Sequence, residues 1–138
     1  MIVVALQEIE KKGKTDTLKR LINLFKGIRG VSLVEEKVGI KDQWAVFDYF
    51  GKKIGITTRG DSEQCIDDDF KGMGECDIYV CAVHSSGKTV DLVKRADEWY
   101  IYGRLTLKSS NKSSEPAMQD HLNDSQALML FDEILKII

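Results

Sequence analysis

The chain has 138 residues, of which 43% are hydrophobic and 30% are charged, and its formal net charge at pH 7 is −2. This composition is typical of one globular domain spanning residues 1–138 and excludes a disordered chain. No apolar run approaches the ~20 residues of a membrane-spanning helix, and no leader-type basic segment precedes the first apolar run. Three cysteines, an odd number, favour free thiols over a disulfide framework. We therefore expect a cytoplasmic protein without a membrane partner.

The charges are divided unevenly along the chain. Residues 1–60 contain 12 Lys and Arg against 7 Asp and Glu, whereas residues 61–138 contain 8 against 15. A basic half suits an anionic ligand, although most of these charges are expected to solvate helix faces. The basic residues are not interleaved with aromatic residues in any compact stretch, so the sequence does not support nucleic-acid binding.

The first 28 residues predict a strand, a loop and a helix. Residues 2–6 form a short β-branched apolar run, which is typical of a buried strand. The segment that follows Gly13 has apolar residues spaced by three and four, which places them on one face of a helix. These residues are Leu18, Leu21, Ile22, Phe25 and Ile28.

The middle of the chain predicts three strands and a helix. Residues 31–38 indicate a strand, and residues 44–50 and 53–57 indicate a hairpin that turns at Gly51. The helix that follows carries Cys65, Ile66, Phe70 and Met73 on one side. Asp61 or Ser62 is expected to cap it.

The last third of the chain continues the alternation of predicted strands and helices. The apolar run 76–83 is typical of a central parallel strand, and the stripe within 89–96 indicates a helix. Residues 99–107 indicate a final strand, and the polar, serine-rich segment 109–116 indicates a loop. The last helix is expected to be capped by Asn123 or Asp124.

This order predicts an α/β fold with three α/β/α layers. Its sheet is expected to be mostly parallel, with the hairpin adding an antiparallel strand at the edge. Ligands of such sheets bind at the carboxyl ends of the strands. Three loops qualify, at residues 8–15, 57–61 and 84–89.

The tripeptide Gly13-Lys14-Thr15 stands between the first predicted strand and helix, and in that context it resembles the Walker A region of P-loop nucleoside triphosphatases. The resemblance implies a P-loop-type sheet that binds ATP or GTP with Mg²⁺. Gly13, Lys14, Thr15 and Asp16 would hold the nucleotide, and Thr15 and Asp61 would hold the metal ion. Asp61 follows the strand 53–58, at an offset that departs from the usual pattern of an acidic residue directly ending the strand.

Glu8 stands where the Walker A pattern has its first glycine. A glycine there permits an unusual backbone turn, whereas Glu8 adds a β-carbon and a negative charge. At ~5 Å and an effective dielectric of ~20, one such charge repels a phosphate charge by roughly 3 kcal/mol. Two hypotheses follow: a nucleotide-binding protein of weak or conditional activity, or a catalytically inactive P-loop-fold module that binds a protein partner or a second copy of itself. The sequence does not decide whether the chain is an enzyme.

Three other motifs have ordinary structural explanations. Gly87-Lys88-Thr89 repeats the tripeptide, but a strand-to-helix turn with a capping threonine explains it. Cys65, Cys76, Cys81 and His84 lack zinc-ligand spacing and are expected to be buried thiols and a lone histidine. The acidic run at residues 67–69 fans around a helix and is expected to form a solvated face.

Overall fold

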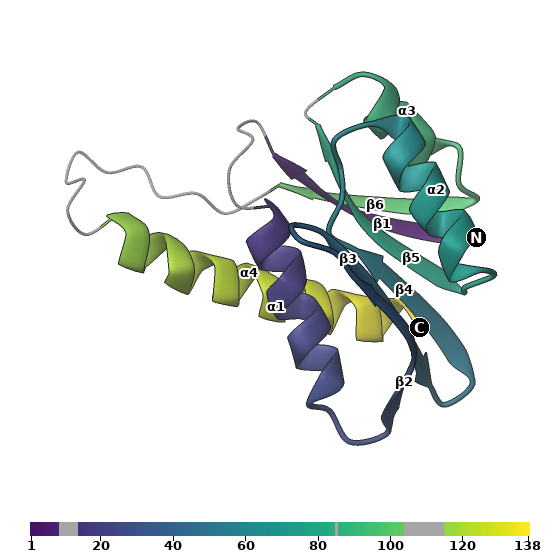
Figure 1. Ribbon diagram of the computed structural model, residues 1–138, viewed down its shortest axis with the longest axis horizontal. Helices are drawn as coiled ribbons and strands as arrows, with labels where there is room; N and C mark the ends of the chain where they lie inside the picture. The colour runs from purple at the N-terminus through teal and green to yellow at the C-terminus, as the bar shows by residue number, and fades with distance from the viewer. Residues whose placement is uncertain (9–13, 85, 104–114) are drawn as a thin grey trace.

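The computed structural model describes residues 1–8, 14–84, 86–103 and 115–138. Within them the chain is an α/β fold with a six-stranded mixed sheet and four helices (Figure 1). In chain order the elements are β1 (Ile2–Glu8), α1 (Lys14–Lys26), β2 (Val31–Val38), β3 (Gln43–Tyr49), β4 (Lys52–Thr57), α2 (Glu63–Met73), β5 (Ile78–His84), α3 (Lys88–Lys94), β6 (Glu98–Gly103) and α4 (Glu115–Ile137).

The sheet has the strand order β2-β3-β4-β5-β1-β6. β1 pairs in parallel with β5 and β6, and β4 pairs in parallel with β5. β3 is antiparallel to both β2 and β4. The predicted hairpin is confirmed as β3 and β4, but its predicted position at the sheet edge is wrong, because β2 lies outside it. The link between β2 and β3 is too short for a parallel crossover, so it forces β2 to pair antiparallel to β3.

Two hydrophobic cores lie on opposite faces of the sheet. The period of two along β1 sends Val4 and Leu6 to one face, and Val3 and Ala5 to the other. Figure 1 shows α1 and α4 over the first face, with α2 and α3 over the second. The strongly apolar sequences of β1 and β5 follow from this burial on both faces.

α1 is fixed to α4 by packing and by polar contacts. The Phe25 ring lies 4.9 Å from the Phe131 ring between centroids. The buried Thr17 hydroxyl donates a hydrogen bond to Asn123 Oδ1 at 3.3 Å, and Arg20 forms ion pairs with Asp120 and Asp124. The beginning of α1 is therefore held in a defined position relative to the sheet.

These contacts explain why one predicted boundary is wrong. α4 begins at Glu115, so Asn123 and Asp124 lie inside it, where their side chains bond to α1 instead of capping α4. Of the predicted loop 109–116, residues 109–114 lie outside the described residues, and Glu115 and Pro116 open α4, where proline is tolerated. Residues 104–107 of the predicted last strand also lie outside them. None of the described helices is long and apolar enough to cross a membrane.

Candidate functional site

The carboxyl ends of β1, β5 and β4 lie side by side, because these strands are neighbours paired in parallel. The loops predicted to carry ligands follow these ends. The chain leaves these ends toward opposite faces of the sheet: α1 follows β1 over the face that α4 also covers, and α3 follows β5 over the other face. In open α/β sheets, ligands bind outside the carboxyl ends of the strands.

Three of the four predicted phosphate-binding residues form the start of α1. Lys14 and Thr15 are its first two residues, Asp16 is exposed in its first turn, and Gly13 lies outside the described residues. Glu8 is the last residue of β1 and pairs in register with His84 of β5. The first N–H groups of a helix lack intrahelical partners and lie at the positive end of the helix dipole. α1 therefore presents hydrogen-bond donors at this edge of the sheet.

Asp61, the predicted metal ligand, lies between β4 and α2 with its side chain exposed. The helix cap is Ser62, whose hydroxyl oxygen accepts a hydrogen bond from the Cys65 backbone N–H at 3.1 Å. The Asp61 carbonyl oxygen lies 3.0 Å from His84 Nε2. Since a carbonyl only accepts, this contact requires the hydrogen of a neutral His84 ring to be on Nε2. The Asp61 carboxylate therefore does not cap α2, and its backbone is fixed to the end of β5.

His84 also connects the ends of β1 and α3. Its carbonyl oxygen accepts a hydrogen bond from Gln7 Nε2 at 3.2 Å, and its backbone N–H donates to Thr89 Oγ1 at 3.0 Å. Thr89 is buried, and α3 begins at Lys88 after Gly87, which has a φ of 93°. The second Gly-Lys-Thr is thus a strand-to-helix turn, as predicted, but the prediction that its threonine caps the helix is wrong. Gly87 is the N-cap without a side-chain hydrogen bond, and the Thr89 hydroxyl accepts from a strand N–H instead.

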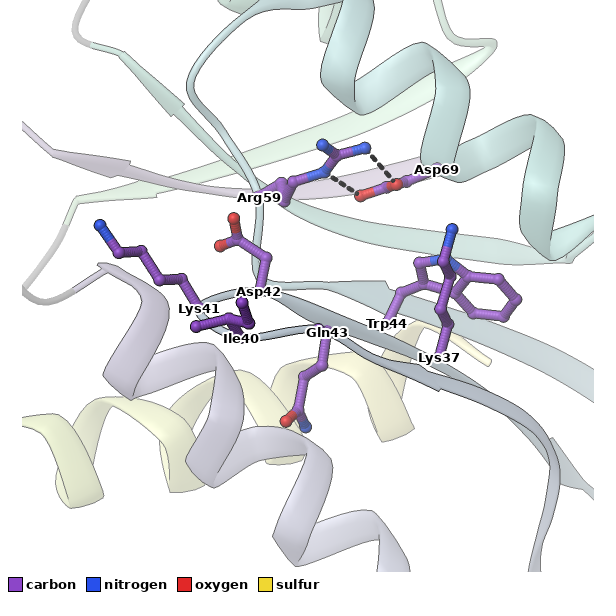
Figure 2. Close-up of a pocket in the computed structure, with 9 residues that line it drawn as sticks. Lys37, Ile40, Lys41, Asp42, Gln43, Trp44, Arg59 and Asp69 are labelled. Atoms are coloured by element: carbon purple, nitrogen blue, oxygen red, sulfur yellow. Dashed lines mark hydrogen bonds and ion pairs between the residues drawn. The ribbon is translucent and has the colours of Figure 1, made fainter.

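A cavity of about 220 Å³ opens beside this edge, between the β2–β3 turn and α2 (Figure 2). Lys37, Lys41 and Arg59 are the basic residues of its lining, and Asp42 and Asp69 are the acidic ones. Figure 2 shows the Gln43 amide pointing away from the cavity.

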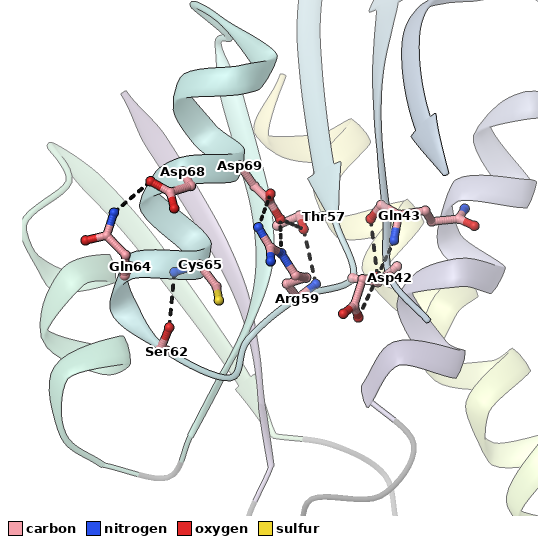
Figure 3. A network of polar contacts seen from close by, with 10 residues as sticks. Asp42, Gln43, Thr57, Arg59, Ser62, Gln64, Cys65, Asp68 and Asp69 are labelled. Atoms are coloured by element: carbon pink, nitrogen blue, oxygen red, sulfur yellow. Dashed lines mark hydrogen bonds and ion pairs between the residues drawn. The ribbon is translucent and has the colours of Figure 1, made fainter. Parts of the chain in front are cut away.

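Arg59 and Asp69 form a two-point ion pair at the wall of this cavity (Figure 3). Arg59 donates from Nε to Asp69 Oδ2 at 3.0 Å and from Nη2 to Oδ1 at 2.8 Å. The Thr57 hydroxyl donates to the same Oδ2 at 2.6 Å and accepts from the Arg59 backbone N–H at 3.1 Å. The hydrogen bonds to Asp69 raise the pKa of the Arg59 guanidinium above its usual range. This network joins the end of β4 to α2.

The prediction that residues 67–69 form a solvated face is wrong for Asp69, which is buried together with Ile66 and Met73. The sequence contained a signal for this. Asp69 lies three residues after Ile66 and four before Met73, which is the spacing of the inward helix face. A carboxylate on that face needs a cationic partner, and Arg59 supplies it.

The cysteines are free thiols, as predicted. Their predicted burial is confirmed for Cys76 and Cys81 and is wrong for Cys65, which is partly exposed. Burial raises the pKa of Cys76 to about 11 and that of Cys81 to about 12. Neither thiol is thus activated as a nucleophile.

Among the described residues, no group of three or more His, Cys, Asp and Glu side chains is placed to hold a metal ion. Comparison of the chain with family models, curated proteins and solved structures finds no match.

Proposed function

We propose that the chain binds a nucleoside triphosphate, ATP or GTP, with Mg²⁺ at the carboxyl edge of β1. In this proposal the sheet is of the P-loop type, with three α/β/α layers. Gly13, Lys14, Thr15 and Asp16 hold the phosphates. Thr15 and Asp61 offer hydroxyl and carboxylate oxygens, which are ligands that Mg²⁺ prefers.

The observation that carries the proposal is the position of α1. β1 leads toward a helix that begins with Lys14-Thr15, and β1 and its neighbour β5 end at the same side of the sheet, where ligands of such folds bind. A helix start at that place combines free N–H groups, a positive dipole and a lysine. The exposed Asp61 follows β4, which is separated from β1 by the parallel strand β5 and ends at the same side of the sheet. Mg²⁺ would neutralise phosphate charge there.

Glu8 makes the proposed activity weak or conditional. In the Walker A pattern this position is a glycine, so Glu8 adds a negative charge that phosphate would disfavour, and it lacks the backbone freedom of glycine. Hydrolysis therefore requires a partner or a change in this loop.

Calorimetric titration with MgATP and MgGTP tests the proposal. We expect wild type to bind at least one of them, Lys14→Ala to weaken binding by at least about tenfold, and Glu8→Gly to strengthen it. Lys88→Ala is the matched control, because it removes the lysine of the second Gly-Lys-Thr and should leave affinity unchanged. Absence of heat with wild type and with Glu8→Gly would overturn the proposal.

A specific surface favours the second function, an inactive module that binds protein. β2 is an edge strand, and Leu33, Val34 and Val38 on it are exposed, as is Ile40 just beyond it. Exposed apolar residues along a sheet edge can pair with another chain. If this function is correct, sedimentation analysis shows self-association that Leu33→Lys and Val38→Lys abolish, whereas Leu128→Lys on the exposed side of α4 has no effect.

A further inference from the structure

We propose that the cavity between the β2–β3 turn and α2 binds the oxyanion group, phosphate or carboxylate, of a small metabolite. This cavity differs from the proposed nucleotide site at the start of α1. Its lining comes from β2, the β2–β3 turn, β3, the segment after β4, and α2. The inference therefore does not depend on nucleotide binding.

The guanidinium of Arg59 is the fixed element of this site. Asp69 occupies its Nε and one N–H of Nη2 through the two-point ion pair. A guanidinium has five N–H groups, so the two on Nη1 and the second on Nη2 remain for another acceptor. Asp69 is itself positioned by Thr57. An arginine held in this way loses little conformational freedom when it binds an anion.

The rest of the lining leaves an excess of positive charge. The Arg59–Asp69 pair neutralises itself, which leaves Lys37 and Lys41 against Asp42 alone. Both lysines are exposed, and Figure 2 shows Lys37 rising beside Trp44 toward α2. The Thr58 hydroxyl lies 3.5 Å from Asp42 Oδ1 and 3.2 Å from the Gln43 carbonyl oxygen, so its single hydrogen goes to the nearer carbonyl and Asp42 keeps its capacity to accept. The cavity therefore attracts a compact anion, with Asp42 available to a donor on the same ligand.

The size of the cavity limits the ligand. Its volume of about 220 Å³ lies below the roughly 300–1,000 Å³ of sites that enclose a drug-sized molecule. The Trp44 side chain is buried and forms a rigid wall, with Gly72 of α2 against its ring. The enclosed part of the ligand is thus an anionic head group with few additional atoms.

Amide and indole NMR shifts of the full chain test this inference, with inorganic phosphate and succinate as probes at constant ionic strength. We expect saturable shifts at the Trp44 indole and at residues 39–43. Lys37→Gln and Lys41→Gln should each weaken binding by about tenfold. Among the described residues neither lysine forms an ion pair, so both variants should fold. Preference for phosphate assigns a phosphorylated ligand, and preference for succinate assigns a carboxylated one.

Two variants serve as controls. Lys52→Gln removes an exposed lysine at the first residue of β4, at the end of that strand far from the cavity, and should not change the affinity. Lys14→Ala should weaken nucleotide binding but leave the shifts at residues 39–43 intact, so the two proposals can fail separately. The inference is overturned if no saturable shift occurs at about 50 mM probe, where a millimolar site is filled. An equal loss in Lys52→Gln, or shifts confined to the start of α1, also overturns it.

Discussion

Arg59 and Asp69 meet through two hydrogen bonds, although one follows β4 and the other lies in the middle of α2. The side chain of Asp69 is 8% exposed, whereas that of Arg59 is 32% exposed. The pair therefore has one buried charge and one that still contacts water. Loss of either partner has unequal consequences, because only the carboxylate would be left buried without a counter-charge.

We predict that Asp69→Asn lowers the free energy of unfolding by about 2 kcal/mol. The change breaks the ion pair but nearly preserves the volume of the side chain, and Arg59 partly recovers by contact with water. Urea denaturation measures the effect. Asp68→Asn is the matched control on the same helix. Asp68 is exposed and accepts a hydrogen bond from Gln64, so its loss should cost less than about 0.5 kcal/mol. Equal costs for the two variants would contradict the assignment.

The order of strands and helices could be predicted from the sequence because each element has a local signal. Strand β2 and helix α2 follow from alternation and from apolar spacing within short windows. The place of the hairpin in the sheet could not be predicted in this way, since it depends on how β2 pairs with β3.

In the candidate site too, some features could be predicted from local sequence signals and others could not. The start of α1 and the position of Asp61 follow from local signals next to predicted strands. The pairing of Arg59 with Asp69 and the contact of His84 with Asp61 depend on neighbouring loops in the folded sheet. No residue spacing contains that information, although Asp69 on an inward helix face could have indicated a buried carboxylate.

Gly60, in the segment between β4 and α2, packs tightly against the backbone of β5 at Ala82. A β-carbon added there would lie 2.5 Å from the Ala82 carbonyl oxygen of β5, so Gly60→Ala forces the segment away from the strand. We predict a loss of about 1–3 kcal/mol in unfolding free energy. A weakened His84–Asp61 contact should accompany it. Gly103→Ala is the control, since among the described residues no heavy atom beyond its chain neighbours lies within 4 Å of the added β-carbon. A difference between the two variants of less than about 0.5 kcal/mol would rule out the steric argument.

The three thiols should differ in their reactivity. Burial raises the pKa of Cys76 to about 11 and of Cys81 to about 12, so at pH 8.5 their thiolate fractions are small and access is blocked. We predict that iodoacetamide labels Cys65 first in the native protein, as measured by peptide mass spectrometry. In Cys65→Ser, labelling of the other two should remain slow until urea unfolds the chain. Rapid native labelling of Cys81 would show that its strand opens.

The packing of α4 on α1 should account for a large part of the stability. Leu130 is fully buried in the core beneath α1 and α4, whereas Leu128 on the same helix is 52% exposed. We predict that Leu130→Ala costs about 2–5 kcal/mol, because it removes buried methyl groups and leaves a cavity. Leu128→Ala should cost less than about 1 kcal/mol.

Because α4 positions the start of α1 through Thr17 and Arg20, Leu130→Ala should also weaken the binding of any ligand at the start of α1. Denaturation and calorimetry of the two variants measure both effects. Equal stabilities would show that α4 does not support α1.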